Sequence, residues 1–145
     1  MQLRMTTKSC FPCAVLTAVL TFCLSGVLVA DTVPPKNADS GVQHVDAQKA
    51  QKLVLEKKVA VLDVRTPGEF NRGHIGGATN IDFQGPDFEQ KIEGLDRSKN
   101  YLVHCASGGR STRSLLLFKK HQFLSIYHLD GGLKAWEKAG LPVEK

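Results

Sequence analysis

The sequence predicts an α/β domain in which helices cover both faces of a parallel β-sheet. From residue 42 onward, short apolar segments alternate with segments of helical periodicity, which is the pattern of successive β–α–β units. The segment Val59–Val64 is apolar except for one acid, which is typical of a strand buried on both sides. In such a sheet the ligand site lies beyond the carboxyl ends of the strands.

The strands are expected where short segments of apolar residues lie between turn signals. In chain order they are Val42–Val45, Val59–Val64, Thr79–Asp82, Tyr101–His104 and Ser125–Leu129. The strand at Tyr101–His104 leads directly into Cys105, so this cysteine is expected at the carboxyl edge of the sheet.

The helices are indicated by capping residues and by the spacing of apolar residues. Asp46 is a favourable N-cap for a helix that runs to about Glu56. Pro67 suits the first position of a short helical turn at Thr66–Phe70. Further helices are expected at Asp87–Ile92, Arg110–His121 and Leu133–Ala139.

Residues 1–30 have the organisation of an export signal. Arg4 and Lys8 form a positive start, and no charge follows until Asp31. We expect cleavage after Ala30. The apolar run at 11–30 is also close to the ~20 residues that span a bilayer, so an uncleaved N-terminal anchor is the alternative. The positive end stays in the cytoplasm, which places the domain in the periplasm, or otherwise outside the cytoplasm, in either case.

We expect residues 31–41 to form a linker, because this segment is rich in proline and polar residues. The domain then comprises residues 42–145. The formal net charge of +5 is spread along the chain without a basic block, so nucleic acid is not indicated as a partner. A membrane tether is possible only through residues 11–30.

The four cysteines reduce to one if the signal is removed, because Cys10, Cys13 and Cys23 all lie within it. Cys105 then has no cysteine with which to form a disulfide or a metal cluster. Structural cysteines outside the cytosol are normally paired, so a single thiol in a glycine-rich loop indicates reactivity.

The stretch Cys105-Ala106-Ser107-Gly108-Gly109-Arg110 joins the expected strand to the expected helix. Its small side chains allow the backbone to curl and to point several N–H groups at one spot. Those donors, together with the positive end of the helix dipole, favour a thiolate at Cys105. The same donors would stabilise a persulfide. Whether the Arg110 side chain points inward or braces the loop is open.

No general base is evident in the sequence. His104 precedes the cysteine, and neighbours in a strand face opposite sides, so a packed strand residue is the favoured interpretation. His44 and His74 are possible contacts from other loops. Zinc is unsupported because the five histidines lack ligand spacing. Asp63 interrupts a buried segment, and we expect it to be paired with backbone or with an arginine, because an unpaired buried carboxylate is costly.

Three stretches resemble the single-domain rhodaneses, the thiosulfate sulfurtransferase-like family. Leu62–Ile81 is similar to the first family signature, Cys105–Arg110 to the active-site pattern C-x-x-G-x-R, and Leu129–Trp136 to the C-terminal signature. Together they span most of residues 42–145 in the family's order and spacing.

The resemblance implies a rhodanese-like fold with a five-stranded parallel sheet. It implies that Cys105 is the nucleophile, which takes sulfane sulfur from a small anion such as thiosulfate and passes it to a thiophilic acceptor such as cyanide or a thiol. On the family pattern, Ala106, Ser107, Gly108, Gly109 and Arg110 line the persulfide pocket. No metal or organic cofactor is implied. Many active members carry a basic residue where this chain has Ala106, which leaves the sulfur donor open.

Two other functions share features of this loop with sulfur transfer. Cysteine phosphatases use a similar loop with five residues between Cys and Arg, whereas four separate Cys105 from Arg110 here, so the ring suits one sulfur atom better than a phosphate. A sulfur-relay module that hands persulfide sulfur to a partner protein would share every loop residue with the enzyme. It therefore stays an alternative, and the protein partner is unknown.

Overall fold

The computed structural model describes residues 41–145. The expected signal or anchor at 1–30 lies outside the described residues, as does the expected linker up to residue 40. Gly41, the last residue of that linker, is already the first residue of a strand. Within residues 41–145, no helix combines the length and apolar character needed to cross a membrane.

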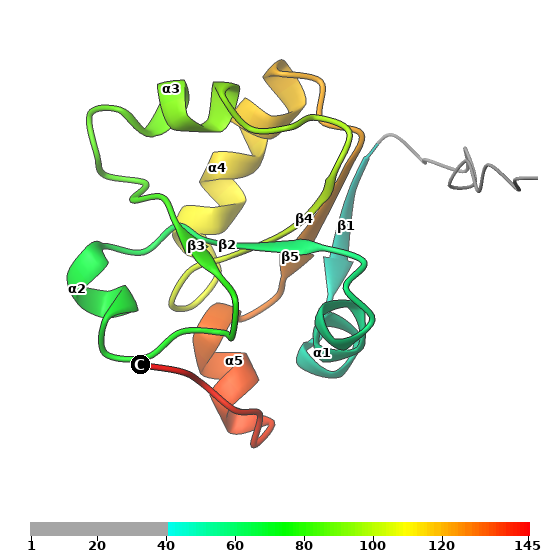
Figure 1. Ribbon diagram of the computed structural model, residues 1–145, viewed down its shortest axis with the longest axis vertical. Helices are drawn as coiled ribbons and strands as arrows, with labels where there is room; N and C mark the ends of the chain where they lie inside the picture. The colour runs from blue at the N-terminus through cyan, green and yellow to red at the C-terminus, as the bar shows by residue number, and fades with distance from the viewer. Residues whose placement is uncertain (1–40) are drawn as a thin grey trace, which may run out of the picture. The chain divides into compact units, whose positions relative to one another are not determined.

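The described chain forms a parallel five-stranded sheet, as expected (Figure 1). The strands are β1 (Gly41–Val45), β2 (Ala60–Asp63), β3 (Thr79–Asn80), β4 (Asn100–His104) and β5 (Ser125–Leu129). Their order across the sheet is β1-β5-β4-β2-β3, and every neighbouring pair is parallel. The strand β4, which leads to Cys105, therefore lies in the middle of the sheet.

All the expected helices are present, and each end lies within one residue of the sequence prediction. They are α1 (Ala47–Leu55), α2 (Pro67–Phe70), α3 (Phe88–Glu93), α4 (Gly109–Lys120) and α5 (Gly132–Lys138). Asp46 caps α1 by accepting a hydrogen bond from the Lys49 N–H at 2.8 Å. Pro67 is the first residue of α2, as predicted.

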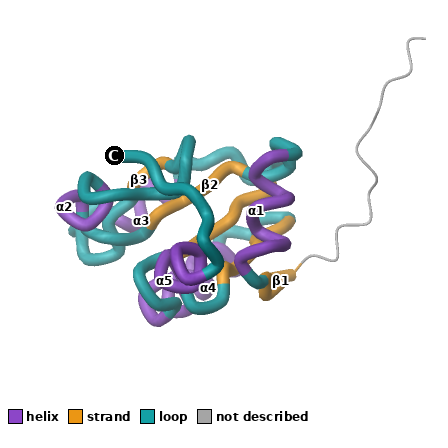
Figure 2. Tube along the Cα trace, turned by 90° about the horizontal axis from the view of Figure 1, so that it is seen from below, coloured by secondary structure: helices purple, strands orange, loops and turns teal. Residues whose placement is uncertain are grey.

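The two faces of the sheet carry two separate hydrophobic cores, because successive residues of a strand point to opposite faces. Tyr101 and Val103 of β4 pack in one core with side chains of α3 and α4, including Phe118. Leu102, between them, packs in the other core with side chains of α1 and α5, including Trp136. Figure 2 shows the helices arranged around the strands. The prediction that helices cover both faces is confirmed.

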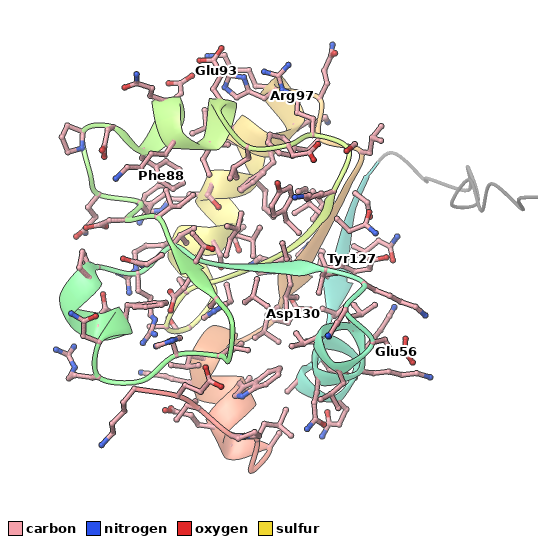
Figure 3. All side chains as sticks on the ribbon, viewed as in Figure 1. Glu56, Phe88, Glu93, Arg97, Tyr127 and Asp130 are labelled. Atoms are coloured by element: carbon pink, nitrogen blue, oxygen red, sulfur yellow. The ribbon has the colours of Figure 1, made fainter. Side chains whose placement is uncertain are left out.

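The carboxyl ends of the central strands bring chemically active side chains to one edge of the sheet. Asp63 is the last residue of β2, and Cys105 follows β4 directly. Asp130 follows β5 and lies near the carboxyl end of that strand (Figure 3). Because β2, β4 and β5 are neighbours and parallel, their ends meet at this edge.

Candidate active site

Cys105 lies between β4 and α4, in a tight loop that folds over its side chain. The residue is 1% exposed. The Gly108 N–H points at the sulfur, with an N–Sγ distance of 3.2 Å, and the Ser111 hydroxyl lies 3.5 Å from it. Gly108 is the N-cap of α4 and has a φ of 100°, a left-handed conformation that glycine adopts without strain. The loop thus turns its donors toward one atom.

The beginning of α5 holds the other side of this loop. The carbonyl of Cys105 accepts the Leu133 N–H at 2.8 Å, and the carbonyl of Ala106 accepts the Lys134 N–H at 3.0 Å. With these two carbonyls turned toward α5, the N–H groups that follow are left to face the sulfur. The contact requires glycine at Gly132, because a Cβ there would lie 2.4 Å from the Cys105 oxygen.

The loop changes the acidity of the thiol through opposing effects. Burial raises the pKa of Cys105, because it disfavours the charged thiolate. Hydrogen bonds from the Ser111 side chain and from the backbone of Ser111, Ser107 and Gly108 favour the thiolate, and together they outweigh the burial. The pKa of Cys105 is therefore below its usual value, which makes the residue a better nucleophile near neutral pH.

Arg110 braces the loop through an ion pair with α2. Its two terminal nitrogens each bond one oxygen of Glu69 in α2, both at 2.7 Å. The same carboxylate completes a capping box with Thr66 at the start of α2. The Arg110 hydrogen bond is the main reason that the pKa of Glu69 falls to about 2. The pKa of Arg110 is raised, mainly by Glu69 and also by the nearby Cys105, so the guanidinium braces the loop and lies close to the thiol.

The other members of the predicted loop take distinct places. Ala106 is partly buried in the wall of a cavity, Ser107 is exposed, and Gly109 is the exposed first residue of α4. Gly108, the N-cap of α4, is buried. All the residues from 105 to 110 thus come together around one strand-to-helix turn.

The cavity beside the loop has a volume of about 220 Å³. Its lining includes Ala106, Arg72, Lys134 and Glu137. Arg65 and Glu69 also line it, but each is held in an ion pair, with Asp63 and Arg110 respectively. The cavity therefore presents the cations of Arg72 and Lys134, with one opposing carboxylate, next to the cysteine loop.

Asp63 has the structural role that the sequence predicts. The carboxylate is fully buried and accepts hydrogen bonds from the Arg65 side chain at 2.6 to 2.9 Å. Arg65 also bonds the carbonyl of Gly73 at 2.7 Å, so the pair ties the loop after α2 to the end of β2.

His104 and His74 do not reach the sulfur through any hydrogen bond of the described residues. His104 is fully buried, and burial lowers its pKa, so the ring is neutral. Its Nδ1 lies 3.3 Å from the carbonyl oxygen of Cys105, so the ring contacts the backbone of that residue and not its thiol. His74 stacks on Phe70 and contacts the Phe70 carbonyl at 3.2 Å. The interpretation of His104 as a packed strand residue agrees with this geometry.

Sequence reasoning missed a histidine that approaches the cysteine through a hydroxyl. His128 of β5 is 2% exposed, and its Nε2 lies 2.9 Å from Ser111 Oγ. Its other nitrogen lies 3.1 Å from Asp130 Oδ1 and 3.3 Å from Nδ1 of His44. The pairing of β1 with β5 sets His44 directly beside His128, a long-range register that no local motif reveals.

The three residues His44, His128 and Asp130 are also the one group within residues 41–145 whose side chains could converge on a metal ion. Their separations are those of hydrogen bonds, with His44 Nδ1 at 2.7 Å from Asp130 Oδ1. Hydrogen bonding thus accounts for the arrangement without a metal.

The fold and the loop together define a class: a parallel α/β domain that presents a cysteine in a cradle of backbone N–H groups at a central strand end. Residues 46–139 match the rhodanese-like domain family, and the chain belongs to that family.

Named relatives agree with this assignment. Thiosulfate sulfurtransferase GlpE of Vibrio cholerae is 30% identical over 101 residues, which are 70% of this chain and 93% of that protein. The chloroplastic rhodanese-like domain-containing protein 14 of Arabidopsis thaliana is 29% identical over 146 residues, with 71% of this chain and 65% of the relative covered. The chain thus spans less than two thirds of that relative.

A solved structure shows the same fold. The crystal structure of a rhodanese-related protein from Thermoplasma volcanium has a TM-score of 0.63 and 32% identity to this chain. The match covers 70% of this chain and 97% of that one.

Proposed function

We propose that this protein is a sulfurtransferase that carries sulfane sulfur on Cys105. The observation that carries the proposal is the cradle: a buried sulfur that faces the Gly108 N–H at 3.2 Å and a serine hydroxyl at 3.5 Å. Such donors stabilise a thiolate and, by the same argument, the terminal sulfur of a persulfide. The name of the Vibrio cholerae relative supports thiosulfate as a donor to test first.

The proposed reaction has two displacements at sulfur. The Cys105 thiolate attacks the outer sulfur of thiosulfate, the S–S bond of thiosulfate breaks, and sulfite leaves with the electron pair. The enzyme then holds Cys–S–S⁻. Cyanide, or another thiophile, attacks the terminal sulfur, and the new S–S bond breaks to release thiocyanate and regenerate the thiolate. No proton and no external oxidant is consumed.

The cavity beside Ala106 is the proposed entrance for the donor. Its size suits a small ion, and Arg72 and Lys134 lie in its lining. Arg72 and Lys134 would supply the positive charge that many active family members carry at the position of Ala106. The donor anion would then reach the cysteine loop at Ala106, from the cavity that Arg72 and Lys134 line.

The pairing of Arg110 argues against phosphate chemistry. A phosphatase loop needs its arginine to hold phosphate oxygens, whereas both terminal nitrogens of Arg110 are bonded to Glu69. The loop also has four residues between Cys105 and Arg110, which leaves a smaller ring.

A test is to incubate the protein with thiosulfate and cyanide and to measure thiocyanate, in the wild type and in Cys105→Ser. Wild-type activity that disappears in the variant supports the proposal, and thiocyanate formation that is independent of Cys105 overturns it. An inactive wild type that gains the mass of one sulfur atom at Cys105 from another donor favours the alternative, a module that relays sulfur to a partner protein.

We further propose that residues 1–30 direct the domain out of the cytoplasm, with residues 31–40 as a linker. The charge pattern of the N-terminus supports this, as does the position of all other cysteines within the segment. N-terminal sequencing of the protein from a periplasmic fraction distinguishes cleavage after Ala30 from an uncleaved anchor. Recovery of the intact chain from the cytoplasm would contradict both.

A further inference from the structure

A continuous line of hydrogen-bonding side chains runs from the Cys105 sulfur to a half-exposed carboxylate. The successive distances are 3.5 Å from Sγ to Ser111 Oγ, 2.9 Å from Oγ to His128 Nε2, and 3.1 Å from His128 Nδ1 to Asp130 Oδ1. Ser111 and His128 are buried, at 0% and 2% exposure, while the Asp130 side chain is 55% exposed. The line thus joins a buried thiol to the surface.

We propose that Ser111 and His128 form a proton relay that ionises Cys105, with Asp130 as the residue that orients and balances the histidine. This inference rests on the proposed role of Cys105 as a nucleophile and adds how its thiolate arises. Sulfur transfer begins and ends with the thiolate, so the relay sets the resting state of the enzyme and is not part of each turnover.

The relay consists of two coupled proton shifts. The S–H bond of Cys105 breaks and its proton passes to Ser111 Oγ, while the hydroxyl proton of Ser111 passes to His128 Nε2. The electron pair of the S–H bond stays on sulfur. His128 becomes an imidazolium whose Nδ1–H donates to the Asp130 carboxylate. The number of protons is unchanged, and the products are a thiolate and an imidazolium joined through one hydroxyl.

The surroundings of Ser111 favour this direction of its hydrogen bonds. The Gly108 carbonyl lies 2.9 Å from Ser111 Oγ, but it already accepts the N–H and the hydroxyl of Thr112, both at 2.9 Å. A carbonyl oxygen has two lone pairs. Three donors thus compete for two lone pairs, which lets the Ser111 proton turn from this carbonyl to the sulfur or to His128. Once His128 is protonated, the acceptors that remain for the Ser111 hydroxyl are the sulfur and the Gly108 carbonyl.

Asp130 is suited to balance a charged His128. Hydrogen bonding from His44 holds the pKa of Asp130 below its usual value, with a further contribution from His128, so the carboxylate is ionised near neutral pH. In the hydrogen bonds and ion pairs of residues 41–145, the titratable groups that contact the His128 ring are His44 from β1 and Asp130 after β5. From α4 the ring meets only the hydroxyls of Ser111 and Thr112.

The test is the pH profile of Cys105 labelling by iodoacetamide in the full chain. Mass spectrometry of the peptide that contains Cys105 keeps Cys10, Cys13 and Cys23 out of the signal. In His128→Asn the midpoint should move up by about one pH unit or more, the size expected when an opposite charge a few ångströms away is lost. His74→Asn is the matched control, because the His74 ring contacts the Phe70 carbonyl and makes no hydrogen bond to the sulfur or to His128 in the described residues.

A double-mutant cycle tests the route through the hydroxyl. Ser111→Ala should raise the midpoint by itself, and adding His128→Asn to it should raise the midpoint by less than the same change does in the wild type, because the hydroxyl that couples the two groups is gone. An unchanged profile in His128→Asn, or an equal shift with and without Ser111, would overturn the relay. If His128→Asn does not fold, Asp130→Asn at the half-exposed end replaces it, with a smaller upward shift expected and an unchanged profile counting against the relay.

The labelling assay is independent of sulfur transfer because it needs no sulfur donor. If the labelling midpoint is the same in every variant as in the wild type, and the protein forms thiocyanate, the relay is wrong and the proposed function stands. If the midpoints shift as expected but the protein forms neither thiocyanate nor a persulfide, the proposed function is wrong and the relay is supported.

Discussion

Arg110 and Glu69 form a two-pronged ion pair that fastens the cysteine loop to α2, with both N–O distances at 2.7 Å. The side chains are 18% and 23% exposed, so solvent screens the pair only in part. Paired guanidinium and carboxylate groups of this geometry combine charge with directional hydrogen bonds. The loop that holds Cys105 therefore depends on a residue that is 41 positions away in the sequence.

Glu69→Gln is expected to loosen this connection. The variant keeps the shape of the side chain but removes its charge, so the free energy of unfolding at pH 7 should fall by roughly 1.5–3 kcal/mol, the range for a hydrogen bond to a charged group. Thiocyanate formation should fall as well, because the loop backbone is less well fixed. Urea unfolding measures the first effect, and Lys91→Gln, which removes an exposed pair with Asp87, is the control with little expected change.

The same pair predicts a specific loss of stability in acid. The pKa of Glu69 is about 2 in the folded protein, below the ordinary value of 4.5. Its contribution is therefore fully present above about pH 4.5 and is lost as the pH falls toward 2. The difference in unfolding free energy between wild type and Glu69→Gln should shrink steadily across this window. A difference that stays constant between pH 7 and pH 3 would contradict the assignment.

Local patterns were sufficient to predict most of the fold. The apolar segments identified each strand, and Asp46 and Pro67 marked the starts of α1 and α2, because these signals act within a few residues. Cys105 at the end of β4 followed from the same reasoning. Asp63 was expected to be paired because a buried carboxylate needs a partner, and Arg65 supplies it.

The contacts that complete the site come from strand register and could not be predicted locally. His128 reaches Ser111 only because β5 lies beside β4, and His44 reaches Asp130 only because β1 lies beside β5. The sequence placed these residues in separate segments, with nothing to indicate that they meet. The bond from Glu69 to Arg110 likewise joins two segments that no local motif connects.

Gly132→Ala should displace the cysteine loop. A Cβ at this position would lie 2.4 Å from the Cys105 oxygen and 2.9 Å from Ser107 N, and the φ of 60° disfavours alanine as well. We expect a loss of more than 2 kcal/mol in unfolding free energy, typical of a clash combined with backbone strain. Gly109→Ala is the control, since a Cβ there meets nothing within 4 Å. Equal stability of the two variants in a thermal melt would refute the close approach of α5.

Asp63→Ala should be among the most damaging single changes outside the loop. It leaves the Arg65 side chain, 7% exposed, without its carboxylate partner. Removing one member of a buried ion pair costs about 3–5 kcal/mol. The comparison is Glu89→Ala, which breaks the exposed pair with Lys120 and should cost far less stability. Similar losses from the two changes in denaturant unfolding would show that the Asp63 pair is not desolvated.

Arg72 and Lys134 give the sharpest test of where the sulfur donor binds. Both line the cavity beside Ala106, and both are exposed, so replacing them should leave the fold intact. If a dianionic donor enters there, Arg72→Ala and Lys134→Ala should each raise the KM for thiosulfate by roughly 5- to 10-fold, the effect of about 1 kcal/mol of lost charge attraction. The rate of Cys105 labelling by iodoacetamide, which is uncharged, should not change. Glu137→Gln removes the opposing charge in the same lining and should lower the KM. A KM that is unaffected by all three changes would place the donor elsewhere.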